Sequence, residues 1–117
     1  MEIETYTLLS KRTLSNLSTK LEDNLHMTLG LVTEASEIAD VYKKKLAYGK
    51  EVDEINVKEE IGDLMFYIVN MCTINGWDLR DILETNVNKL LIRYPLTFSN
   101  ENAINRNLTA ERNELKK

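Results

Sequence analysis

Apolar residues recur at steps of three and four along most of the chain, the spacing that places side chains on one face of an α-helix. The pattern predicts four helices: roughly residues 2–20, a second from a cap at Asp23 or Asn24 to Tyr48, roughly 57–74, and roughly 79–94. No run of β-branched residues alternates with polar ones as in a half-buried strand. We therefore expect an all-α fold with a four-helix core bundle.

The expected helix ends rest on residue types that favour them. Short polar side chains accept hydrogen bonds from the free N–H groups of a first turn, and glycine adopts the left-handed conformation that ends many helices. We expect N-caps at Asp23 or Asn24, at Asn56 and at Asp78, and helix ends at Gly49, at Gly76 and before Pro95.

No repeat, low-complexity tract or Gly/Ser linker divides the chain, so we expect a single domain over residues 1–117, with its core at about 23–95. The tail, residues 96–117, is polar with scattered apolar residues. It predicts either a short helix or a segment that orders only against a partner chain.

The pattern places two pairs of carboxylates on or beside the expected packing faces. Glu60 and Glu34 each lie in an apolar stripe at helical spacing, and Asp63 and Glu37 follow them by one turn, the spacing that brings side chains together. The stripe of Glu60 contains Leu64, Tyr67 and Met71, and that of Glu34 contains Met27, Leu31, Ile38 and Val41. For one pair alone, a solvated charged face is the commoner explanation. Four crowded carboxylates repel one another, and such an oxygen cluster suits Mg²⁺ or Mn²⁺.

The fourth predicted helix carries Asn86, Lys89 and Arg93 on one stripe, beside an apolar face. Arginine offers a planar fork to phosphate oxygens and lysine a mobile point charge, so this stripe is a candidate polyphosphate site. An ordinary amphipathic border is the alternative. Gly62, inside the third helix, predicts the close approach of another helix or of a ligand.

Composition and missing motifs narrow the function. The net charge of −4 argues against a general nucleic-acid binder, and no apolar stretch is long enough to span a bilayer. The start of the chain, MEIETYTLLSKR, has no signal or transit pattern, so we expect a cytoplasmic protein. Cys72 and His26 are each the only residue of their type, and there is no phosphate-cradling P-loop.

Three stretches, "GLVTEASEIAD", "VKEEIGDLMFYI" and "NVNKLLIRYP", resemble in this order the MazG-type nucleoside triphosphate pyrophosphohydrolases of the all-α NTP pyrophosphatase superfamily. The resemblance covers about residues 25–95, and the tail is similar to that of small single-domain members. The family binds Mg²⁺ through E-x-x-E and E-x-x-D, here Glu34, Glu37, Glu60 and Asp63. Its K-x-x-x-R element falls on Lys89 and Arg93, with Asn86 beside them, as triphosphate contacts.

The resemblance implies Mg²⁺-dependent cleavage of an NTP or dNTP between the α- and β-phosphates, with Mn²⁺ as the alternative cation. We assign Glu37 as general base, and the resemblance implies a homodimer or homotetramer that assembles through helix faces. Two positions depart from the family: Thr33 stands where a further Glu is common, and Ser36 where Gly is. The alternatives are a catalytically silent helical interaction or regulatory module, and a narrower dUTPase-, dCTPase- or alarmone-directed hydrolase.

Overall fold

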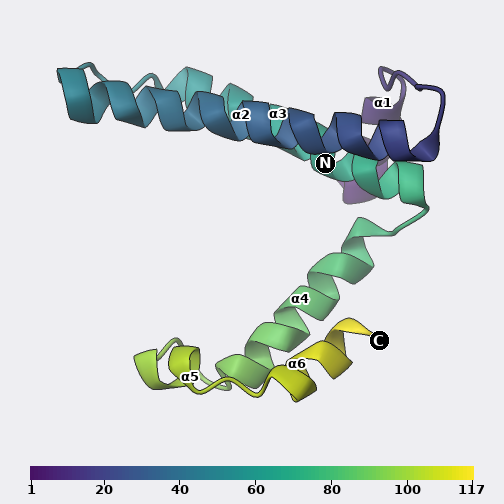
Figure 1. Ribbon diagram of the computed structural model, residues 1–117, viewed down its shortest axis with the longest axis vertical. Coiled ribbons are helices and arrows are strands. Elements are labelled where there is room, and N and C mark those ends of the chain that lie inside the picture. The colour runs from purple at the N-terminus through teal and green to yellow at the C-terminus, as the bar shows by residue number, and fades with distance from the viewer. The chain divides into compact units, whose positions relative to one another are not determined.

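The computed structural model describes residues 1–117, and its regular elements are all helices. These are α1 (Ile3–Lys11), α2 (Lys20–Tyr48), α3 (Glu54–Asn75), α4 (Leu79–Arg93), α5 (Asn100–Ile104) and α6 (Leu108–Leu115) (Figure 1). The all-α prediction is confirmed. The chain divides into two compact units, Met1–Gly76 with α1–α3 and Trp77–Lys117 with α4–α6. The expectation of a single domain stays a prediction.

In the first unit, α2 and α3 run side by side in opposite directions (Figure 1). Asn24, near the start of α2, and Asn75, at the end of α3, exchange two side-chain hydrogen bonds of 3.2 and 2.6 Å. Met27 and Val69, each 1 % exposed, lie in the core of this unit. The antiparallel pair therefore sets which residues of the two helices face each other.

α2 comes close to α3 at Gly30. A Cβ atom built there would lie 2.2 Å from Cε1 of Tyr67, so the Tyr67 ring occupies the space that a side chain would need. At Gly62, nothing lies within 4 Å of the corresponding position. The Tyr6 hydroxyl of α1 donates to the Gly62 carbonyl at 3.5 Å, on another side of this glycine. The expectation that a helix or a ligand comes close to Gly62 stays a prediction.

α1 packs on α3 and is shorter than predicted. It ends at Lys11 rather than near residue 20, because the stretch that follows is rich in Ser, Thr and Asn, which hydrogen-bond to nearby backbone and compete with the helix. The hydroxyl of Thr13 donates to the Ser10 carbonyl at 3.1 Å, and the Leu17 N–H donates to Asp23 at 2.6 Å.

Two predicted N-caps are wrong by a few residues. Thr19, not Asp23 or Asn24, caps α2, and its hydroxyl accepts from the Glu22 N–H at 3.1 Å. Asp53, not Asn56, caps α3 by accepting from the Asn56 N–H at 3.1 Å. Each stretch holds several residues able to cap, and the helix begins at an earlier one than predicted.

The remaining boundaries are confirmed. Gly49 and Gly76 end α2 and α3 with φ of 67° and 69°, the left-handed conformation that glycine adopts without strain. Asp78 caps α4 by accepting from the Arg80 N–H at 2.8 Å, and α4 ends at Arg93, two residues before Pro95.

The second unit contains α4 and the tail. The tail forms two short helices, α5 and α6, and α6 packs against α4. Of the two alternatives for the tail, the structure shows helix formation. None of the six helices combines the length and the hydrophobicity that a membrane span requires.

Candidate metal centre

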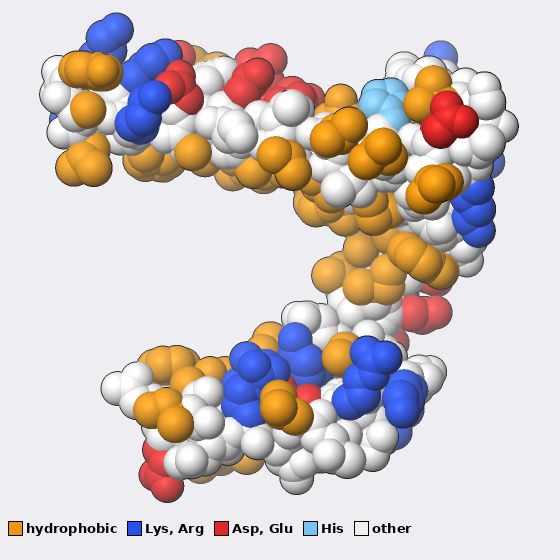
Figure 2. Space-filling view, viewed as in Figure 1, with side chains coloured by type: hydrophobic (Ala, Val, Ile, Leu, Met, Phe, Trp, Pro, Cys, Tyr) orange, Lys and Arg blue, Asp and Glu red, His pale blue; other side chains and the backbone are white.

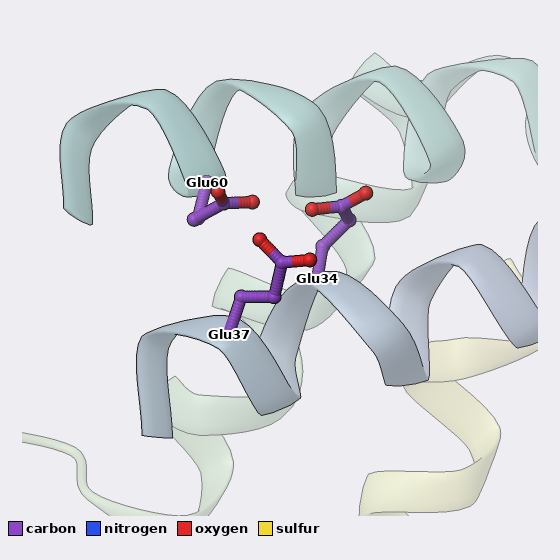
Figure 3. Close-up of side chains that lie close together, drawn as sticks. All are labelled: Glu34, Glu37 and Glu60. Atoms are coloured by element: carbon purple, nitrogen blue, oxygen red, sulfur yellow. The ribbon is translucent and has the colours of Figure 1, made fainter. Parts of the chain in front are cut away.

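Three acidic side chains converge between α2 and α3. Figure 3 shows Glu34 and Glu37 reaching from α2 toward Glu60 on α3. One carboxylate oxygen from each of the three lies within 4.8 Å of the others. The structure thus brings together three of the four residues that the sequence predicts as metal ligands.

The fourth, Asp63, belongs to a second acidic group that shares Glu60. Oxygens of Glu59, Glu60 and Asp63 also lie within 4.8 Å of one another. Glu59 was missed by the sequence reasoning, although its i, i+4 spacing to Asp63 was a signal. Glu60 is therefore common to both groups. One group joins it to acids of α2, and the other joins it to acids of its own helix, α3.

Glu60 is the buried member of both groups. It is 4 % exposed, and its Oε2 is buried without a hydrogen-bond partner. Hydrogen bonding to Glu34, which requires a proton between the two carboxyl groups, then burial, then the contact and charge of Glu37 raise the pKa of Glu60 to about 8. A buried carboxylate that has one unpartnered oxygen and lies beside two further acids fits a divalent cation, which would replace the shared proton.

The helix pairing that places these acids follows from local sequence. Glu34 lies one turn after Gly30, and Gly30 lets α2 approach the Tyr67 ring of α3. Tyr67 is held from the side by edge contacts with Phe66 and His26, at centroid distances of 5.3 and 6.4 Å. Close packing one turn away therefore brings Glu34 within reach of Glu60.

A hollow of about 360 Å³ opens beside Glu37. Its other lining residues are Ser36, Asp40, Val41, Lys44 and Asn56. Lys44 pairs with Asp40 at 2.7 Å, and this contact lowers the pKa of the Asp40 carboxyl group. Asp40 is thus paired with Lys44. Glu37 has no such pair and lies between the other two acids, Glu34 and Glu60, and the hollow.

The predicted phosphate contacts lie in the second unit. Because α4 is one unbroken helix, Asn86, Lys89 and Arg93 share a face at steps of three and four, as predicted. Arg93 is mostly buried and donates from Nε and Nη2 to Glu111 on α6, at 3.0 and 2.7 Å. The sequence reasoning missed Glu111, which appears there only as one acid in a polar tail.

Paired helices with an E-x-x-E and an E-x-x-D that supply a convergent carboxylate cluster define an all-α protein with a candidate divalent-cation site. The family model described as MazG nucleotide pyrophosphohydrolase domain matches residues 22–98, and the chain belongs to this family. The family acts on nucleotides and generally depends on a divalent metal ion. Neither the comparison with curated proteins nor that with solved structures finds a match.

Proposed function

We propose that this protein is a Mg²⁺-dependent nucleoside triphosphate pyrophosphohydrolase that produces a nucleoside monophosphate and pyrophosphate. The observation that carries the proposal is the convergence of Glu34 and Glu37 on the buried Glu60, whose Oε2 has no hydrogen-bond partner, in a chain of the MazG family. Burying a carboxylate without a compensating partner is costly, and a catalytically silent helical module would gain nothing in return.

Glu34, Glu37, Glu60 and Asp63 would hold the cation, with Glu59 as an additional acid beside Asp63. When bound, Mg²⁺ supplies charge neutralisation for phosphate oxygens and lowers the pKa of a coordinated water. Mn²⁺ prefers the same oxygen ligands and is expected to replace it.

Glu37 is the proposed general base. It is the exposed member of the group of three, and it borders the hollow on α2, so its carboxylate can accept a proton from a water on the open side of the site. The proposed contacts of the triphosphate are Asn86, Lys89 and Arg93. The positively charged side chains of Lys89 and Arg93 stabilise the charge of the departing pyrophosphate.

Assembly with further copies of the chain is part of the proposal. Apolar side chains at steps of three and four on α2, Leu25, Leu29 and Val32, are each more than half exposed, and the first unit does not cover them. Figure 2 shows hydrophobic side chains gathered along one edge of this unit. Obligate interfaces between protein chains are rich in apolar side chains, so such a face suits a homodimer or homotetramer. Analytical ultracentrifugation distinguishes these two states from a monomer.

The site is tested with two matched variants of α3. Glu60→Gln removes the shared ligand, whereas Glu54→Gln changes an exposed acid in the first turn of the same helix. We expect Mg²⁺ to raise the melting temperature of the wild type and of Glu54→Gln at pH 8, because a ligand that binds only the folded state stabilises it, by about 2.7 kcal/mol at a hundred times its Kd. Glu60→Gln should show no such rise.

Turnover completes the test. Glu60→Ala should abolish the release of pyrophosphate from a nucleoside triphosphate while the circular dichroism spectrum stays helical. Retained turnover in Glu60→Ala would mean that the site is elsewhere, and the absence of both turnover and a Mg²⁺ effect in the wild type would favour the silent module.

A further inference from the structure

The most buried acid of the second unit is Glu111, which has no assigned part in the proposed function. Glu111 on α6 has a side chain that is only 3 % exposed, and it is held by Arg93 from α4 and by Arg106 from the segment between α5 and α6. One arginine is enough to neutralise one carboxylate, so the second arginine leaves an excess positive charge that needs an explanation.

Hydrogen bonds hold the guanidinium groups of Arg93 and Arg106 against the same carboxylate. Arg93 donates from Nε and Nη2 to Oε1 of Glu111, at 3.0 and 2.7 Å. Arg106 donates from Nε to Oε2 at 3.0 Å and from Nη2 to Oε1 at 3.2 Å. Both Nη2 atoms therefore share one oxygen, and Glu111 offsets the repulsion that two adjacent arginines would otherwise feel.

The three side chains keep a net positive charge. Hydrogen bonding from Arg106 and then from Arg93 lowers the pKa of Glu111, so its carboxylate stays ionised beside two permanent cations. Each guanidinium carries five N–H groups, of which the bonds to Glu111 engage Nε and Nη2. Arg93 also contacts the side chain of Tyr94, whereas the Nη1 group of Arg106 remains able to donate to a further anion.

The accessible part of this cluster is Arg106. Its side chain is 38 % exposed, against 17 % for Arg93. Lys89 lies one helical turn before Arg93 on α4. Figure 2 shows Lys and Arg side chains gathered on one face of the second unit. The tail thus adds a cation to the α4 stripe that the sequence marks for phosphate.

We propose that Arg106 is a further phosphate-binding residue and that Glu111 is a positioning residue, which holds Arg106 beside Arg93 so that the remaining N–H groups of Arg106 donate to oxygens of the substrate's phosphate chain. This inference rests on the proposed function for the identity of the substrate. Its geometry rests on the contacts among Glu111, Arg93 and Arg106 alone.

Binding of inorganic tripolyphosphate, measured by calorimetry on the full chain without divalent metal, tests the inference. Arg106→Gln keeps the Arg93–Glu111 pair and should weaken binding about tenfold, or about 1.4 kcal/mol. Glu111→Gln removes the positioning charge and should weaken binding at least as much. The control, Glu114→Gln, lies on the same helix and pairs only with Lys117 in the structure, so its affinity should equal that of the wild type.

Kinetics separate positioning from a structural role. In turnover, Arg106→Gln should raise KM about tenfold while kcat changes less than about threefold, because the lost contact binds the phosphate chain in substrate and transition state alike. Glu111→Gln should raise KM at least as much and should also lower kcat, because it releases Arg93, the proposed stabiliser of the departing pyrophosphate. If Glu111→Gln only lowers the melting temperature and leaves KM and tripolyphosphate binding unchanged, Glu111 is a structural tether and the proposal fails. Tighter binding in Glu111→Gln would show that the carboxylate competes with phosphate, which also overturns it.

The two proposals fail separately. Wild-type binding of tripolyphosphate that depends on Arg106, without turnover of any nucleoside triphosphate, would refute the proposed function and leave the anion site standing. Turnover with no dependence on Arg106 would refute only the anion site.

Discussion

Replacing Gly30 by alanine tests whether the spacing of α2 and α3 is set by the contact at Tyr67. The added Cβ would lie 2.2 Å from Cε1 of the Tyr67 ring and 2.4 Å from Cδ1 and Cζ. Carbon atoms pack at about 3.5–4.0 Å, so the ring or the helix must move by more than about 1 Å. Phe66 and His26 flank the ring edge-on and restrict its movement.

The magnitude follows from two opposing terms. Overpacking a close contact costs about 1–3 kcal/mol, while alanine is about 1 kcal/mol more favourable than glycine inside a helix. Gly62→Ala on α3 is the matched control, because nothing lies within 4 Å of its Cβ position and only the favourable term applies. The helix-propensity term cancels between the two variants. We therefore expect Gly30→Ala to be about 1–3 kcal/mol less stable than Gly62→Ala.

Urea unfolding of both variants, followed by circular dichroism at one protein concentration and with EDTA present, measures this difference. Adding Tyr67→Leu to Gly30→Ala should recover part of the loss, because the two residues are in direct contact and their effects are coupled. Gly30→Ala should also lose part of its stabilisation by Mg²⁺, since α2 carries Glu34 one turn further on.

Equal stability of Gly30→Ala and Gly62→Ala would refute this reasoning. It would mean that the Tyr67 ring moves aside at no cost and that the acids are brought together by something other than the close contact at Gly30.

Two further predictions concern stability. The pKa of Glu60 is raised to about 8 in the folded protein from a usual value of 4.5, so the folded state binds this proton more tightly than the unfolded state. Metal-free protein should therefore lose stability as the pH rises from about 5 to 8. Saturating Mg²⁺ should remove that trend. A melting temperature that rises over this range without metal would contradict the shared proton. Thr19→Ala should cost about 1 kcal/mol in urea unfolding, since it removes the cap of α2, while Thr28→Ala on the same helix should cost less. Equal losses would mean that the cap is not what matters.

The sequence predicts best what depends on neighbouring residues. The ends of α2 and α3 at Gly49 and Gly76 follow from a backbone conformation that glycine adopts easily, and α4 lies between a cap at Asp78 and Pro95. The position of Glu60 in an apolar stripe predicts its burial in the same way, because helical periodicity alone shows which face packs.

Helix starts are harder, because several residues compete for the same role. Residues 18 and 19 are Ser and Thr and precede Asp23, and Asp53 precedes Asn56, so each stretch offers more than one cap. Asp23 does not cap α2, because its carboxylate accepts from the Leu17 N–H instead. Such choices depend on the hydrogen bonds of the preceding loop, which periodicity does not describe.

Contacts between helices distant in sequence are the least predictable. The match of Gly30 with Tyr67 depends on the register of α2 against α3, and a glycine in a helix looks the same in sequence whether its face is covered, as at Gly30, or open, as at Gly62. Glu111 is a similar case. Its burial depends on how α6 packs on α4, whereas in sequence it is one of many charged residues in a polar tail.

The central claim is that the acids held by α2 and α3 direct cleavage between the α- and β-phosphates. Incubating wild-type protein with Mg²⁺ and a panel of ribo- and deoxyribonucleoside triphosphates, with products followed by phosphorus NMR, tests it most directly. We predict a nucleoside monophosphate and pyrophosphate, with no product when Glu60→Ala replaces the wild type. Orthophosphate as the only inorganic product, from a preparation free of pyrophosphatase, would contradict the claim because a different bond would have been cut.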